Sequence, residues 1–270
     1  MSHCLQGIET SLVITDDNAA FLLPSLWFNA EFRFSFFMEA ETMWISRDYC
    51  ENLGTFHTID GIKALALYSI YMLILLIQGF TYTTNLSVDI LNKLQIAFPL
   101  LLLAILFVFM ALSNNKLCTV GLNKTKLFQS LLLGIVLAVC LVIGTAVCFR
   151  VFRNKAVGIT YPLLSVWNIF IIGAFEEEIT FRGYIQTRLT GIIRQPVLCS
   201  CCTALLFLAI HYPVRWVVGG FSLNCLSLYY VVSLIILHFA CDFVYNKTNC
   251  LWGAIVLHLL YNIGQSMLVL

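Results

Sequence analysis

From Lys63 to the end of the chain, long apolar runs alternate with short polar breaks such as residues 113–116 and 246–249. About seven of these runs approach the roughly 20 residues that a helix needs to cross a membrane. They are Ala64–Tyr82, Leu94–Leu112, Leu131–Phe152, Pro162–Gly183, Pro196–Tyr212, Leu226–Tyr245 and Leu251–Val269. Because hydrocarbon offers no water to exposed backbone groups, runs of this length are predicted to be helices. The pattern predicts an all-α fold, a polytopic transmembrane bundle of about seven helices.

The composition agrees with this pattern. Hydrophobic residues make up 60% of the chain and charged residues 11%, whereas soluble domains carry about 25% charged residues. The net charge of +1 gives no electrostatic basis for binding nucleic acid. We therefore expect a multi-pass integral protein in a lipid bilayer, with no nucleic-acid partner.

The chain divides into three regions. Residues 1–62 contain no run of membrane length and form a poorly specified N-terminal region, in which Phe32–Met38 is a candidate interfacial segment. Residues 63–155 are predicted to form the N-terminal membrane helices. Residues 156–270 are predicted to form the catalytic membrane core.

Ionisable side chains gather in that last region. Beyond residue 60, four of five acidic residues lie in the last four predicted helices, namely Glu176, Glu177, Glu178 and Asp242. Three of the five histidines, His211, His238 and His258, lie in the last three. Burying such groups in a membrane is costly, so they indicate function.

The acidic cluster has a definite helical geometry. Glu178 and Arg182 are four residues apart, on one helix face, where they can form an ion pair. Glu177 lies about 100° around the helix from Glu178, free of that arginine, and is a candidate general base. Glu176 could exchange roles with Glu177. A solvated acidic helix end at the membrane surface is the alternative.

The histidines also come in spaced motifs. His211 follows Phe207 by four residues, and His258 precedes Asn262 by four, so that the imidazole and the amide can address one point. His238 and Asp242 have the same spacing, and could pair with each other, support the site or bind a metal. Interfacial positions or hydrogen bonds between helices are the structural alternatives.

Three motifs in order, each on its own apolar segment, carry a family resemblance. Glu177-Glu178-x-x-x-Arg182, Phe207-x-x-x-His211 and His258-x-x-x-Asn262 resemble those of the CAAX prenyl protease and bacteriocin-processing (CPBP, Abi-type) family of intramembrane metalloproteases. The resemblance covers about residues 160–265, with a looser match back to residue 95.

The resemblance implies roles for these side chains. Glu177 and His211 would activate a water molecule, and His258 with Asn262 would bind that water, stabilise the oxyanion or contribute to a metal site. Glu178 and Arg182 would brace the first motif. A divalent metal, with zinc as the first candidate, would be held by Glu177, His211 and His258. The supporting residues are Glu178, Arg182, Glu176, Phe207, His238 and Asp242.

We therefore predict an intramembrane endopeptidase that cleaves a membrane-associated peptide or protein with an active site in the last four helices. With the resemblance, we expect it in the plasma membrane of a bacterium. A non-proteolytic membrane protein of the bacteriocin-immunity type stays open as the alternative. Transport or proton relay uses the same residue types, although the sequence shows neither paired broken helices nor an inverted repeat. Haem binding by the three membrane histidines is the remaining alternative.

Overall fold

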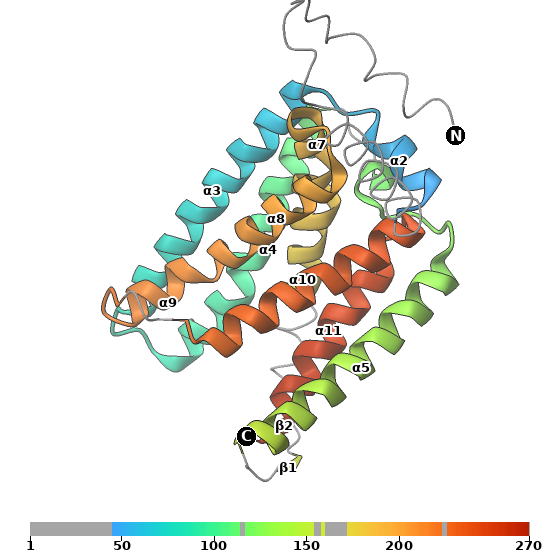
Figure 1. Cartoon of the computed structure of the whole chain (residues 1–270). Coiled ribbons are helices and arrows are strands. Elements are labelled where there is room, and N and C mark those ends of the chain that lie inside the picture. Colours follow the sequence, from blue (N-terminus) through green and yellow to red (C-terminus); the bar gives the residue numbers. More distant parts are fainter. Residues whose placement is uncertain (1–44, 114–116, 154–157, 160–171, 223–225, 270) are drawn as a thin grey trace, which may run out of the picture.

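The computed structural model describes residues 45–113, 117–153, 158–159, 172–222 and 226–269. The candidate interfacial segment Phe32–Met38 and the first ten residues of the predicted run Pro162–Gly183 lie outside these residues. Helices dominate the described part (Figure 1). The all-α prediction is therefore confirmed, with one two-residue antiparallel pair, β1 (Gly158–Ile159) and β2 (Leu268–Val269), beside the helices.

The long helices follow the predicted apolar runs closely. They are α3 (Thr58–Tyr82), α4 (Val88–Leu112), α5 (Leu127–Arg153), α8 (Pro196–Ile210), α10 (Leu228–Thr248) and α11 (Trp252–Met267). Shorter helices are α2 (Arg47–Leu53), α7 (Thr187–Ile193), α9 (Tyr212–Val218) and a 3₁₀ turn at Leu117–Val120. Residues 172–193 form one continuous helix whose middle, Ile179–Gln186, is π-helical.

Within the described residues, five helical segments are long and apolar enough to cross a membrane. They are Thr58–Tyr82, Val88–Leu112, Leu127–Cys148, Pro196–Val218 and Leu228–Thr248. The predicted number of about seven is therefore not confirmed. The helix over 172–193 carries too many charged side chains, and α11 has only 16 residues. Five such segments in the described residues nevertheless make the chain an integral membrane protein.

The helix over 172–193 lies at the centre of the bundle, packed against α3 and α8. Every residue of its π-helical stretch is buried. Phe181 packs edge-on against Tyr71 of α3 and Phe207 of α8, with ring centroids 5.5 and 5.4 Å apart. A π-helical turn is rare and is frequent at functional sites, because the extra residue in the turn redirects the side chains.

One buried cation near the end of this helix, Arg188, has several polar and aromatic partners. The Arg188 guanidinium donates to the Gly183 carbonyl at 2.9 Å and to the Thr119 hydroxyl at 2.9 Å, and it stacks on the Tyr184 ring. Burial lowers the pKa of Arg188 to about 10, so this side chain stays charged at neutral pH.

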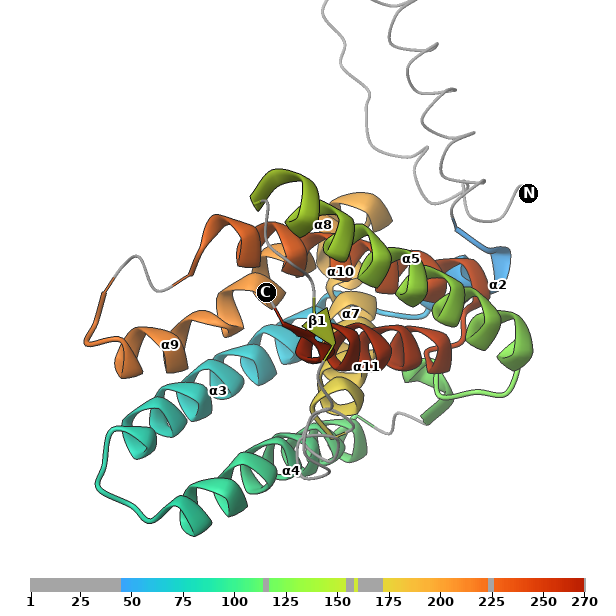
Figure 2. The same cartoon turned by 90° about the horizontal axis from the view of Figure 1, so that it is seen from below.

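Small residues bring α5 against α11, which run side by side (Figures 1 and 2). A Cβ atom at Gly134 would overlap the carbonyl oxygen of Gly253, and one at Gly253 would overlap that of Ser130. The Ser130 hydroxyl also donates to the Cys250 carbonyl at 2.7 Å. Such close approach is how membrane helices associate when the hydrophobic effect between them is absent. It fixes α11, which carries His258 and Asn262.

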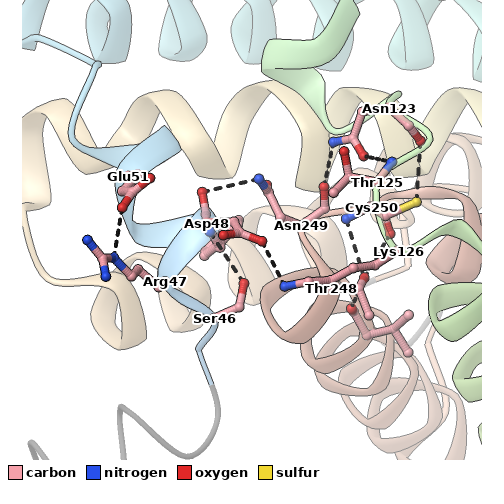
Figure 3. Close-up of polar contacts among 12 residues, drawn as sticks. Ser46, Arg47, Asp48, Glu51, Asn123, Thr125, Lys126, Thr248, Asn249 and Cys250 are labelled. Carbon is pink, nitrogen blue, oxygen red and sulfur yellow. Dashed lines mark hydrogen bonds and ion pairs between the residues drawn. The ribbon is translucent and has the colours of Figure 1, made fainter. Parts of the chain in front are cut away.

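The short helix α2 is joined to the far end of the chain by polar contacts (Figure 3). The backbone N–H of Ser46 donates to the Asn246 carbonyl at 2.8 Å, and Asn249 donates to the Asp48 carbonyl at 3.1 Å. Lys126 forms an ion pair with Asp48 at 2.7 Å. We call this set of contacts the α2 clamp. Part of the region that the sequence left poorly specified is thus built into the folded bundle.

Candidate active site

The centre of the site is a buried carboxylate that accepts two hydrogen bonds. Glu178 Oε1 accepts from Arg182 Nη1 at 2.9 Å and from His258 Nδ1 at 2.8 Å, and the side chains of Glu178 and Arg182 are 0% exposed. The ion pair that the four-residue spacing predicted is therefore present. Since Nδ1 of His258 donates its proton to Glu178, Nε2 of the neutral ring carries a lone pair.

That lone pair faces Glu177, the first glutamate of the motif. His258 Nε2 lies 3.8 Å from Glu177 Oε2, too far for a direct hydrogen bond. A polar gap of this width suits a bridging water. The Glu177 side chain is 23% exposed, whereas its neighbour Glu178 is fully buried. The structure thus places Glu177 as predicted, away from Arg182 and toward the imidazole.

Glu176 points elsewhere. Its carboxylate accepts from the Tyr71 hydroxyl of α3 at 2.8 Å and from the Thr180 hydroxyl at 3.0 Å. These bonds hold Glu176 away from His258, so of the two exchangeable candidates only Glu177 approaches the histidine. Sequence reasoning missed Tyr71, whose only signal was a hydroxyl among the apolar residues of α3.

Phe207 is surrounded by the other motif side chains. The Arg182 guanidinium carbon lies 4.3 Å above its ring centroid. The rings of His211 and His258 have centroids 5.0 and 6.2 Å from that of Phe207. One aromatic ring therefore contacts all three motifs, which gives the Phe of Phe207-x-x-x-His211 a packing role.

His211 ends α8 at the point where α9 begins. Its Nδ1 lies 2.8 Å from the Phe207 carbonyl, and because a carbonyl only accepts, Nδ1 carries the proton. Nε2 is then free to act on a ligand. His211 and His258 both pack on the Phe207 ring, and His258 approaches Glu177, so the structure brings the three residues to the same part of the bundle.

Asn262 lies one helical turn beyond His258 and is partly buried. Among the described residues, the Asn262 side chain makes no hydrogen bond to Glu177, His211 or His258. Its position on the face of His258 follows from helical spacing.

His238 and Asp242 do not pair with each other. Asp242 accepts from the Ser200 hydroxyl at 2.5 Å and from the Gln186 side chain. The His238 ring instead packs on Phe207, with centroids 5.8 Å apart. Both residues lie behind the site, where they brace α8 and α10 against the central helix.

Within the described part of the chain, no three His, Cys, Asp or Glu side chains are grouped closely enough to hold a metal ion. The arrangement therefore does not fit a metal held by Glu177, His211 and His258 together. Binding of zinc stays a prediction from the sequence. The hydrogen bond from His258 to Glu178 would orient the imidazole equally well for binding a metal or for binding a water molecule.

Two further side chains beside the motifs were not singled out by sequence reasoning. Arg215 stacks on the Tyr230 ring at 4.1 Å, and the Tyr230 and His211 ring centroids lie 5.9 Å apart. The signal in the sequence was the position of Arg215, four residues after His211, on the same helical face.

Comparison with known families gives one match. Residues 159–264 match the family model described as type II CAAX prenyl endopeptidase Rce1-like. These bounds agree with the range over which the three motifs carried the resemblance. No curated protein and no solved structure matches the chain.

Proposed function

With the resemblance to the CAAX prenyl endopeptidases confirmed over residues 159–264, we propose that this chain is an intramembrane endopeptidase that acts by Glu- and His-activated water. Its substrate class is a membrane-associated protein that ends in a prenylated CAAX segment, and the bond cleaved follows the prenylated cysteine. The observation that supports this proposal is the 3.8 Å gap between Glu177 Oε2 and His258 Nε2 inside the bundle.

The two acceptors at this gap explain how a water molecule would be held. A water that donates one hydrogen to Glu177 and the other to His258 Nε2 keeps its lone pairs directed outward, toward a peptide carbonyl. Glu177 takes one proton as the oxygen attacks the carbonyl carbon, and it later passes that proton to the leaving amine. No cofactor is needed to balance these steps.

The remaining motif residues serve the same reaction. In the proposed mechanism, His211 assists Glu177 in proton transfer through Nε2, and the Asn262 amide donates to the oxyanion that forms on the carbonyl. Glu178 fixes the tautomer of His258, and Arg182 keeps Glu178 ionised. Because donors and acceptors are held by buried partners, little reorganisation accompanies the reaction.

A site inside the bilayer suits a lipidated substrate. A prenyl chain partitions into lipid, at about 0.8 kcal/mol per buried CH₂. The adjacent peptide bond would then be delivered to a site enclosed by membrane helices. The plasma membrane of a bacterium stays our prediction for where the protein works.

The proposal is tested with purified protein in liposomes and a prenylated CAAX peptide. Glu177→Gln and His211→Ala should each lower kcat by about 100-fold or more, since general acid–base groups contribute about 10²–10⁴. Glu51→Gln on α2, whose side chain is 64% exposed, is the matched control and should cleave at the wild-type rate. Undiminished cleavage by both site variants would refute the assignment.

Two further measurements separate the alternatives. Metal analysis of wild type and His258→Ala tests the predicted zinc directly, through metal content rather than activity. A Glu177→Gln variant that retained the biological function of the protein in cells would favour the non-proteolytic, immunity-type alternative.

A further inference from the structure

Arg215 occupies a position next to the proposed catalytic centre that the mechanism above does not use. It lies on α9, one turn beyond His211, and it is exposed although it falls within the apolar span Pro196–Val218. Arg215 lies three residues before the end of that span, where a long arginine side chain can reach either the membrane surface or the neighbouring site.

The guanidinium of Arg215 is held near the site instead of extending away from it. It stacks 4.1 Å above the Tyr230 ring centroid, and that ring lies 5.9 Å from the His211 ring. These two distances place the guanidinium carbon within about 10 Å of the His211 imidazole.

In the described part of the chain, Arg215 has no carboxylate in ion-pair distance. Among the motif carboxylates, Glu178 is bonded to Arg182 and His258, and Glu176 to Tyr71 and Thr180. Glu177 lies 3.8 Å from His258 Nε2 and is not in ion-pair distance of Arg215. The stack on Tyr230 orients the guanidinium, while the donor edge of the planar fork remains able to bind an anion.

We propose that Arg215, oriented by Tyr230, binds the C-terminal carboxylate of the peptide substrate. This inference rests on the proposed function and specifies how the end of the substrate is recognised. Three residues separate the scissile bond from the carboxylate in a CAAX segment, and three extended residues span about 10 Å. The His211 ring and the Arg215 guanidinium carbon are at most about 10 Å apart, so a segment of this length can reach from one to the other.

An anionic lipid headgroup is the competing ligand for an arginine near the end of a membrane span. The geometry favours the peptide, because Arg215 turns toward Tyr230 and the histidine. A carboxylate also matches the bidentate geometry of the guanidinium.

The test compares two prenylated CAAX peptides that differ only at the end, one with a free carboxylate and one with a C-terminal amide. Wild type, Arg215→Ala and Arg215→Lys are assayed in liposomes with and without anionic lipid. Arg47→Ala, an exposed arginine of α2, is the matched control. We expect wild type to prefer the free carboxylate by about 10- to 100-fold in kcat/KM, mainly through a lower KM. This fold-change is the one expected for hydrogen bonds to a charged group.

Arg215→Ala should lose this preference and cleave the amide peptide at the wild-type rate, which also shows that the variant is folded. Arg215→Lys should retain an intermediate preference, because it keeps the charge but loses the fork. Equal cleavage of both peptides by wild type, or an equal loss on both in Arg215→Ala, would overturn the inference while leaving the protease intact. So would an effect of Arg215→Ala that appears only with anionic lipid. Absence of cleavage of either peptide by wild type would instead refute the proposed function, and the inference with it.

Discussion

The chain contains two arginine–glutamate pairs of equal spacing and distance but opposite burial, which allows the effect of burial to be tested. Both pairs are spaced by four residues and both have a nitrogen–oxygen distance of 2.9 Å. The side chains of Arg47 and Glu51 are 81% and 64% exposed, whereas those of Arg182 and Glu178 are 0% exposed.

Replacing Arg182 by Met keeps an unbranched side chain against Phe207 but removes the charge. Glu178 is then a buried carboxylate whose remaining partner is His258. Removing one partner of a buried pair costs about 3–5 kcal/mol. We therefore expect the free energy of unfolding of Arg182→Met to fall by about that amount. Arg47→Met should lower it by less than about 1 kcal/mol, since exposed pairs contribute little.

The assay is equilibrium unfolding in mixed detergent micelles, followed by tryptophan fluorescence. The double variant Glu178→Gln/Arg182→Met should recover most of the loss, because a buried pair replaced as a whole is often neutral. The side-chain amide that replaces the Glu178 carboxylate in that variant still offers a carbonyl to His258. The reasoning would fail if the free energy of unfolding of Arg182→Met were within about 1 kcal/mol of the wild-type value. It would also fail if the double variant were no more stable than Arg182→Met.

Three shorter predictions follow from the packing. Gly134→Ala should destabilise the protein by about 1–3 kcal/mol, because its methyl group would meet the backbone of Gly253. Gly144→Ala on the same helix has open space around it and should not be destabilised. Equal melting temperatures of the two variants would contradict this. Tyr49→Ala should cost about 3–5 kcal/mol, since it removes a buried ring packed on α10, and should expose α2 to limited proteolysis; an unchanged digestion pattern would count against it. Asp242→Asn should leave kcat within about threefold of wild type, because this carboxylate bonds Ser200 and Gln186; a loss comparable to that of Glu177→Gln would assign it a direct role.

The sequence could predict the features that follow from regular spacing along the chain. Apolar runs predicted the ends of the long helices to within six residues, the largest differences being at the starts of α3 and α4. A spacing of four predicted the pair between Glu178 and Arg182. The approach of His258 to the glutamates, 80 residues earlier in the chain, followed only from the family resemblance.

Other features have no local signal. The partner of Glu176 is Tyr71, 105 residues away on another helix. The π-helical stretch Ile179–Gln186 contains residue types that an ordinary α-helix also tolerates, so its wider turn depends on packing. His238 and Asp242 show the limit of spacing alone. They share a helix face, yet Asp242 bonds two side chains from other helices.

The α2 clamp has a practical consequence for defining the minimal catalytic fragment. A truncation at Lys63, where the apolar runs begin, would delete Tyr49, whose ring packs on Tyr245 and whose hydroxyl lies 3.4 Å from Gln186. Gln186 in turn bonds Asp242, so water would gain access to the rear of the catalytic bundle. A shortened version meant for crystallisation or activity assays should therefore begin ahead of Ser46.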